Sequence, residues 1–184
     1  EKKLNNDFLI LENKKLRDLI NESIQSEDLY AKVLVDKDSP YLKSIILNKG
    51  SKDNVKIGMA IVDNSYLVGK VIEVNYTNSR ALLLSDLNSK IPVLLEPLDV
   101  HAVASGTGKN YGVIEYTKDD YDQKIKDKKI IVYTSGYGGL FKPGLPVGKI
   151  IYDNTINDNI INFFSDFRQL DYVKIVSYDI GSGN

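Results

Sequence analysis

The chain has 184 residues, 42% of them hydrophobic, and a formal net charge of −1 at pH 7. This apolar content supports one ordinary domain or two small ones and excludes a disordered chain. The near-neutral charge argues against a protein that binds nucleic acid by neutralising phosphates, and the absence of cysteine excludes disulfides and thiolate metal sites.

An amphipathic helix is predicted over residues 4–24. Leu9 and Leu16 are seven residues apart and occupy one position of a heptad repeat. Asn13 and Ile20 have the same spacing and occupy the other apolar position. An asparagine in such a seam pairs best with its copy on a second chain, so the pattern favours a parallel coiled-coil dimer. The alternative is a single helix that packs on its own domain.

The chain after residue 29 is predicted to be β-structure. About a dozen short apolar or alternating segments follow one another, separated by turn residues. No helical pattern long enough for a parallel crossover separates them. The pattern therefore predicts antiparallel barrels or sandwiches.

One sequence phrase occurs twice and divides this β-region. Two β-segments, the second containing Val-Gly-Lys, occur over residues 55–74 and again over 130–152. The predicted fold is therefore mainly β, with an N-terminal helix and two small antiparallel β-barrel subdomains. The predicted limits are 1–28 for the coiled-coil helix, 29–102 and 103–178 for the two barrels, and 179–184 for a flexible tail.

The sequence offers little for metal or cofactor chemistry. His101 is the only histidine, so a site with two histidine ligands from one chain is excluded. The aspartates are scattered, and none of their runs has the spacing of a calcium-binding loop. We therefore predict no metal site, no cofactor and no catalytic residue.

The strongest enzymatic alternative is a serine protease built on two barrels. It would use Ser135 as nucleophile, His101 as base, and Asp86 or Asp99 as the residue that orients the histidine. The order of these residues along the chain argues against it. The glycines around Ser135 have a simpler role, because they permit tight turns between strands.

The glycine-rich loop in the second copy of the phrase is the candidate contact surface. Tyr137 and Phe141 lie in this loop, and aromatic side chains are enriched at protein interfaces. The alternative is that both rings pack onto their own barrel. A further alternative is a carbohydrate-binding module that uses its tyrosine and phenylalanine faces.

The order and spacing of several phrases resemble the rod-shape-determining MreC family, over about residues 9–176. The most specific segment is TSGYGGLFKPGLPVGK at residues 134–149. The chain departs from the family pattern at two predicted turns. Lys128-Lys129 replaces the usual Gly-Asp, and Tyr66 replaces a glycine. The other matching phrases are ENKKLR, AKV, NKGS, VKIGMAIV, LVGKV, SRALLL and DLNSKIPV.

The resemblance implies a non-enzymatic scaffold of the bacterial cell-elongation machinery. It implies a single-pass protein of the cell membrane, with this chain on the extracytoplasmic side as a coiled-coil helix and two barrels. The implied partners are MreB, MreD, RodA and an elongation-specific penicillin-binding protein. It also implies a homodimer that can associate further.

Overall fold

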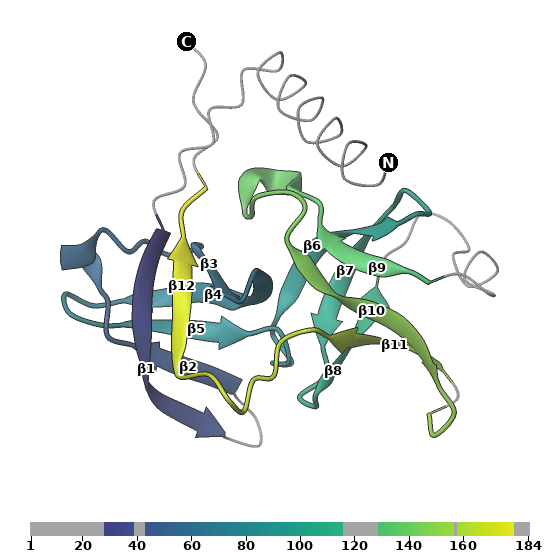
Figure 1. Ribbon diagram of the computed structural model, residues 1–184, viewed down its shortest axis with the longest axis horizontal. Helices are drawn as coiled ribbons and strands as arrows, with labels where there is room; N and C mark the ends of the chain where they lie inside the picture. The colour runs from purple at the N-terminus through teal and green to yellow at the C-terminus, as the bar shows by residue number, and fades with distance from the viewer. Residues whose placement is uncertain (1–27, 39–42, 116–128, 157, 179–184) are drawn as a thin grey trace, which may run out of the picture.

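The computed structural model describes residues 28–38, 43–115, 129–156 and 158–178 (Figure 1). The helix predicted over residues 4–24, with its seam residues, lies outside the described residues. Within the described ranges the regular structure is β-strand and two short 3-10 turns, and no helix there has the length and hydropathy to cross a membrane. The elements are β1 (Asp28–Asp38), β2 (Lys43–Leu47), η1 (Ser51–Asp53), β3 (Ala60–Asp63), β4 (Tyr66–Val74), β5 (Ser79–Leu83), β6 (Lys90–Glu96), β7 (Val100–Gly106), β8 (Tyr111–Glu115), β9 (Ile131–Thr134), η2 (Tyr137–Gly139), β10 (Pro146–Asp153), β11 (Asp158–Phe163) and β12 (Tyr172–Val176).

The strands form two closed antiparallel barrels that lie side by side (Figure 1). The first barrel has the strand order β1-β12-β3-β4-β5-β2, and the second has the order β10-β11-β8-β7-β6-β9. Closure leaves no sheet edge open for pairing with another chain. The prediction of a mainly β protein with two small antiparallel barrels is confirmed.

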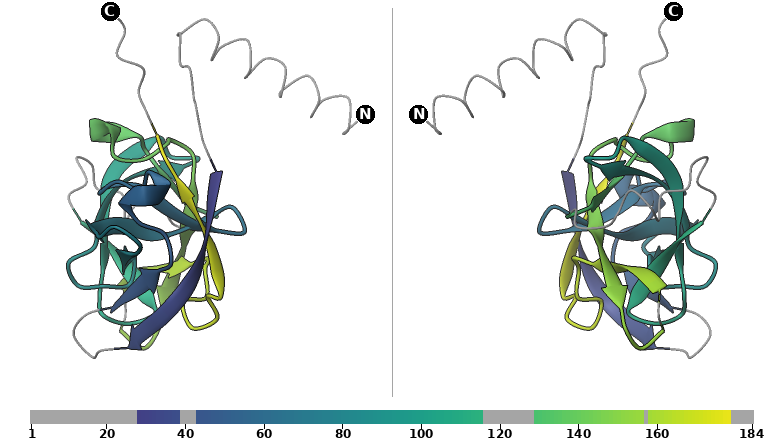
Figure 2. Two further views of the ribbon diagram at one scale, coloured as in Figure 1. Left: turned by 90° about the vertical axis from the view of Figure 1, so that its left-hand side faces the viewer. Right: turned by 90° about the vertical axis from the view of Figure 1, so that its right-hand side faces the viewer.

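The membership of the strands differs from the predicted division at residues 102 and 103. β6 was expected in the first barrel and lies in the second, and β7 crosses the expected boundary. β12 was expected in the second barrel, yet it closes the first one between β1 and β3. Figure 2 shows β1 and β12 next to each other on the outside of the first barrel. The second barrel is thus inserted between β5 and β12.

The two barrels nevertheless have one topology. The strands of the second barrel, β6 to β11 in chain order, correspond to β12, β1, β2, β3, β4 and β5 of the first. Under this match, strands that are neighbours in one barrel are neighbours in the other. The first barrel is therefore a circular permutation of the second, because its first strand comes from the end of the chain. The doubled Val-Gly-Lys phrase falls on β4 and β10, which are equivalent strands under this match.

Each copy of the phrase forms the same irregularity in its strand. Val68 has no partner on β3, and Val147 has none on β9, so each strand carries a β-bulge at its valine. The next residue in each copy is a glycine where the backbone approaches a neighbouring strand closely. A Cβ on Gly69 would lie 2.0 Å from the Leu82 carbonyl oxygen, and one on Gly148 would lie 2.5 Å from that of Asn162.

Apolar side chains fill both barrels and join them in one continuous core. Strands such as β6 alternate between buried and less buried residues, as expected for strands with one face inside a barrel. β4 and β10 touch where the barrels meet. Near this contact the rings of Tyr66 and Phe164 lie 5.1 Å apart, and the Ser165 hydroxyl donates a hydrogen bond of 3.3 Å to the Leu67 carbonyl.

Candidate functional site

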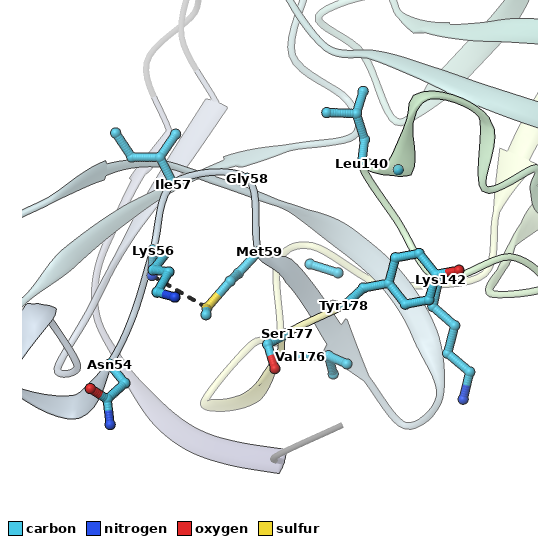
Figure 3. Close-up of a pocket in the computed structure, with 12 residues that line it drawn as sticks. Asn54, Lys56, Ile57, Gly58, Met59, Leu140, Lys142, Val176, Ser177 and Tyr178 are labelled. Carbon is cyan, nitrogen blue, oxygen red and sulfur yellow. Dashed lines mark hydrogen bonds between the residues drawn. The ribbon is translucent and has the colours of Figure 1, made fainter. Parts of the chain in front are cut away.

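A groove of about 420 Å³ opens between the two barrels (Figure 3). Its first wall is the loop that precedes β3, its second wall is the glycine-rich loop between β9 and β10, and the end of β12 adjoins both. The residues that line it are Asn54, Lys56, Ile57, Gly58, Met59, Ala60, Gly139, Leu140, Lys142, Val176, Ser177 and Tyr178.

The first wall begins at a turn that hydrogen bonds hold in place. The Asp53 carboxylate accepts a hydrogen bond of 3.2 Å from the Gly50 amide and another of 3.2 Å from the Lys49 ammonium. The amide hydrogen bond, helped by that ammonium, holds the pKa of Asp53 below its ordinary value. Val55 is buried and anchors the next stretch, while Ile57 is 70% exposed.

A buried hydroxyl group helps to hold the second wall, together with two backbone hydrogen bonds that join Thr134 to Gly144 and to Leu145. Thr134 donates a hydrogen bond of 2.6 Å to the Lys142 carbonyl and accepts one of 2.9 Å from the Leu145 amide. These contacts join the two ends of the glycine-rich loop at the end of β9. They leave Leu140 at the groove with 49% of its surface exposed.

The two aromatic residues predicted as a contact surface have opposite environments. Phe141 is 1% exposed and belongs to the core, so it is an anchor of the loop and offers no surface to a partner. Tyr137 is 77% exposed on η2. Burial of Phe141 is physically reasonable because its ring has no polar group to keep in water, whereas the tyrosine hydroxyl does.

The sequence did not reveal the aliphatic residues of the groove. Ile57 and Leu140 are far apart in the chain, and only the packing of the two barrels places them around one groove (Figure 3). A signal was present for Ile57, because it is an apolar residue in a polar segment just before Gly58. Leu140 had a similar signal in the glycine-rich loop.

The charge of the groove is positive. Lys56 is exposed and Lys142 is half-buried, and no aspartate or glutamate is among the described residues that line the groove. Ion pairs within the described ranges join Lys49 to Asp53, Arg80 to Glu73 and Lys90 to Glu115. Neither groove lysine takes part in them.

The residues of the protease alternative do not come together. His101 lies on the exposed face of β7, opposite Leu94 of β6. The Ser135 hydroxyl accepts a hydrogen bond of 3.2 Å from the Tyr137 amide. Among the described residues no hydrogen bond joins Ser135 to His101, so the pairing that activates a serine nucleophile is not formed.

The two aspartates of that alternative have structural environments. Asp86 is buried and accepts hydrogen bonds of 2.7 Å from the amides of Lys43 and Asn88. Asp99 lies in the turn between β6 and β7, with a φ of 53°. The described part of the chain also holds no cluster of three histidine, aspartate or glutamate residues able to bind a metal ion. The groove itself exposes apolar side chains at Ile57 and Leu140 and positive charge at Lys56 and Lys142.

Comparisons with known proteins agree with the fold. A family model described as the barrel core of the rod shape-determining protein MreC matches residues 33–177. The cell shape-determining protein MreC of Haemophilus influenzae is 32% identical over 162 residues, which are 86% of this chain and 44% of that protein. This chain therefore spans less than half the length of that relative.

Two solved structures show the same architecture. MreC of Listeria monocytogenes aligns over 100% of this chain and 93% of its own, with a TM-score of 0.78 and 24% identity. A chain from the complex between penicillin-binding protein PBP2 and MreC of Helicobacter pylori aligns over 83% of this chain and 99% of its own, with a TM-score of 0.59 and 13% identity. At such identities these likenesses show the fold, while the family match rests on the sequence. The match over residues 33–177 places this chain in the MreC family of rod shape-determining proteins.

Proposed function

We propose that this chain is the extracytoplasmic part of a non-enzymatic scaffold that helps to direct peptidoglycan synthesis during cell elongation. Its role is to bind an elongation-specific class B penicillin-binding protein. The observation that carries this proposal is the groove between the two closed barrels, where exposed Ile57 and Leu140 lie beside two lysines. The complex solved for the Helicobacter pylori proteins supports the choice of partner.

The remaining parts of the proposal come from family membership. The whole protein is a single-pass protein of the cell membrane that also works with MreB, MreD and RodA. It forms a homodimer through Leu9, Asn13, Leu16 and Ile20, and the dimers can associate further. The heptad spacing of these four residues supports the dimer.

Direct binding tests the proposed function. The chain is titrated with the purified extracytoplasmic part of the class B penicillin-binding protein from the same organism, and the dissociation constant is measured by calorimetry. We expect saturable binding with a defined stoichiometry. Absence of binding at the highest soluble concentrations would contradict the proposal. A class B enzyme that acts in cell division instead of elongation serves as the control.

A carbohydrate-binding role remains the second candidate because two exposed tyrosines share the outer face of the first barrel. Tyr30 lies opposite Lys174, and Tyr172 lies opposite Lys32, on the paired strands β1 and β12. Exposed rings of this kind can stack on sugars. Co-sedimentation with purified peptidoglycan, for the wild type and for a variant with both tyrosines changed to alanine, tests this role separately from protein binding.

A further inference from the structure

We propose that the groove between the barrels binds a segment of the penicillin-binding protein that combines apolar side chains with at least one carboxylate. This inference rests on the proposed function and adds the chemistry of the recognised segment. It follows from the apolar side chains at the groove, from the positive charge of its two lysines and from the polar groups of its lining.

The apolar part of the argument starts from Ile57 and Leu140. Their exposed fractions are 70% and 49%, so water contacts a large part of both side chains. Figure 3 shows them on the two loops that face each other across the groove. Met59 and Val176 extend this apolar surface into the groove. Burying these side chains together against a partner is favourable, because it removes their apolar surface from water.

The charged part of the argument concerns the two lysines on opposite walls. Lys56 belongs to the first barrel and Lys142 to the second, so each wall of the groove carries a lysine. The described lining residues include no carboxylate, which leaves positive charge in excess. An occupant with a carboxylate complements this charge, whereas one with a lysine or arginine in the same place is disfavoured.

The character of the lining favours a protein segment over a small molecule. Small-molecule sites combine an apolar pocket with a few convergent, precisely placed polar groups. Among the described residues, no buried side chain that lacks a hydrogen-bond partner lines the groove. Gly58 and Gly139 line the groove without side chains, and a Cβ built on Gly58 would meet no atom within 4 Å.

The test compares groove variants with matched controls in binding to the extracytoplasmic part of the penicillin-binding protein. Ile57→Asp and Leu140→Asp each introduce a charge at an apolar contact, and Ile156→Asp makes the same change at an exposed isoleucine in the turn between β10 and β11. We expect each groove variant to weaken binding by about tenfold or more, as for central interface residues, and the control to bind as the wild type does. Thermal unfolding monitors the fold of every variant.

A second set tests the carboxylate. A double variant with Lys56→Glu and Lys142→Glu reverses both groove charges, and Lys109→Glu reverses an exposed lysine in the turn between β7 and β8. We expect the double variant to bind about tenfold more weakly at low salt and to gain affinity as salt is added, whereas the wild type loses affinity. Screening weakens the attraction in the wild type and the repulsion in the variant.

The outcomes separate the alternatives. Wild-type affinity in the apolar variants would overturn the groove as the binding site and leave the proposed function intact. Unchanged affinity in the lysine double variant, with loss in the apolar variants, would overturn the carboxylate. If the groove variants change only the sedimentation coefficient of this chain, the occupant is a second copy and the inference is wrong. Failure of the wild type to bind the enzyme would overturn both proposals.

Discussion

Val68 of the first barrel and Val147 of the second occupy the same position in two copies of one bulge. The Val68 carbonyl accepts a hydrogen bond of 2.9 Å from the Leu84 amide, and the Val147 carbonyl accepts one of 3.1 Å from the Phe164 amide. In each barrel the donor follows the neighbouring strand, β5 or β11. A bulge increases the local bend of a strand, so this shared device helps each small sheet to curve into a barrel.

The glycines that follow these bulges are predicted to be intolerant of any side chain. Gly69→Ala and Gly148→Ala should each cost about 3 kcal/mol or more of unfolding free energy, because the new Cβ meets backbone atoms of the adjacent strand and these cannot rotate away. Urea denaturation measures the change. Gly58→Ala is the comparison, since no atom lies within 4 Å of its Cβ position and only its φ of 91° resists substitution. That variant should lose about 1–2 kcal/mol. An equal loss in all three variants would contradict the role of close approach.

The sequence allowed the two related barrels to be predicted, but it did not allow their boundary to be predicted. Most strand positions follow from apolar alternation and from turn residues, which are local properties of the chain. Which strand closes a barrel depends on pairing between strands that are far apart in the chain. β12 has the same kind of pattern as a final strand of the second barrel would have, and only its pairing with β1 and β3 assigns it to the first.

Thr134 is predicted to hold the second wall of the groove. Thr134→Val keeps the size of the buried side chain but removes the hydroxyl, so the Lys142 carbonyl and the Leu145 amide lose this partner. We expect a loss of about 1–3 kcal/mol in unfolding free energy and faster hydrogen exchange at Leu145. Thr134→Ser retains the hydroxyl and is the control. If both variants exchange at the wild-type rate, the loop does not depend on this group.

The candidate site was predicted only in part, and for a physical reason. The glycine-rich loop was identified from its composition and its aromatic residues, and it does form one wall of the groove. The direction of each ring depends on contacts with strands elsewhere in the barrel, so the sequence did not distinguish buried Phe141 from exposed Tyr137. The partner wall at Ile57 depends on the packing of one barrel against the other.

Asp86 is predicted to stabilise the protein by a hydrogen bond that joins the connection between the barrels to the start of β2. Asp86→Ala should destabilise the protein by about 1–3 kcal/mol, because the amide of Lys43 loses a buried hydrogen-bond acceptor. Asp86→Asn keeps one acceptor oxygen and should lose less. Chemical denaturation monitored by tyrosine fluorescence provides the measurement. A greater loss for asparagine than for alanine would show that the hydrogen bond is not the important contribution.

The heptad seam predicts a dimer that depends on Leu16. Leu16→Ala should weaken dimerisation by about 2–5 kcal/mol if that side chain is fully buried between two helices. Arg17→Ala, on the outer side of the heptad, is the control and should dimerise normally. Analytical ultracentrifugation over a concentration series measures the dissociation constant, and a chain that begins at residue 29 should sediment as a monomer. A wild-type chain that stays monomeric at high micromolar concentration would contradict the seam.

Acid is predicted to loosen the first wall of the groove through Asp53. The pKa of Asp53 is lower in the folded protein than its ordinary value of 3.8, chiefly because its carboxylate accepts the Gly50 amide hydrogen bond. Its contribution to stability is therefore complete above the unfolded pKa and is lost as the pH falls through the folded one. The unfolding free energy of the wild type should fall below about pH 4, and that of Asp53→Asn should fall less steeply.

A second carboxylate separates this local effect from general acid sensitivity. The pKa of Glu115 is also lowered, first by the hydrogen bond from the Lys90 ammonium, but Glu115 lies on β8 and does not line the groove. Glu115→Gln should therefore reduce the acid dependence of stability without changing partner binding at neutral pH. Asp53→Asn should also weaken the binding, because the Gly50 amide loses its charged acceptor and the turn that precedes Ile57 is held less firmly. Equal binding by the two variants would show that the turn at Asp53 does not position Ile57.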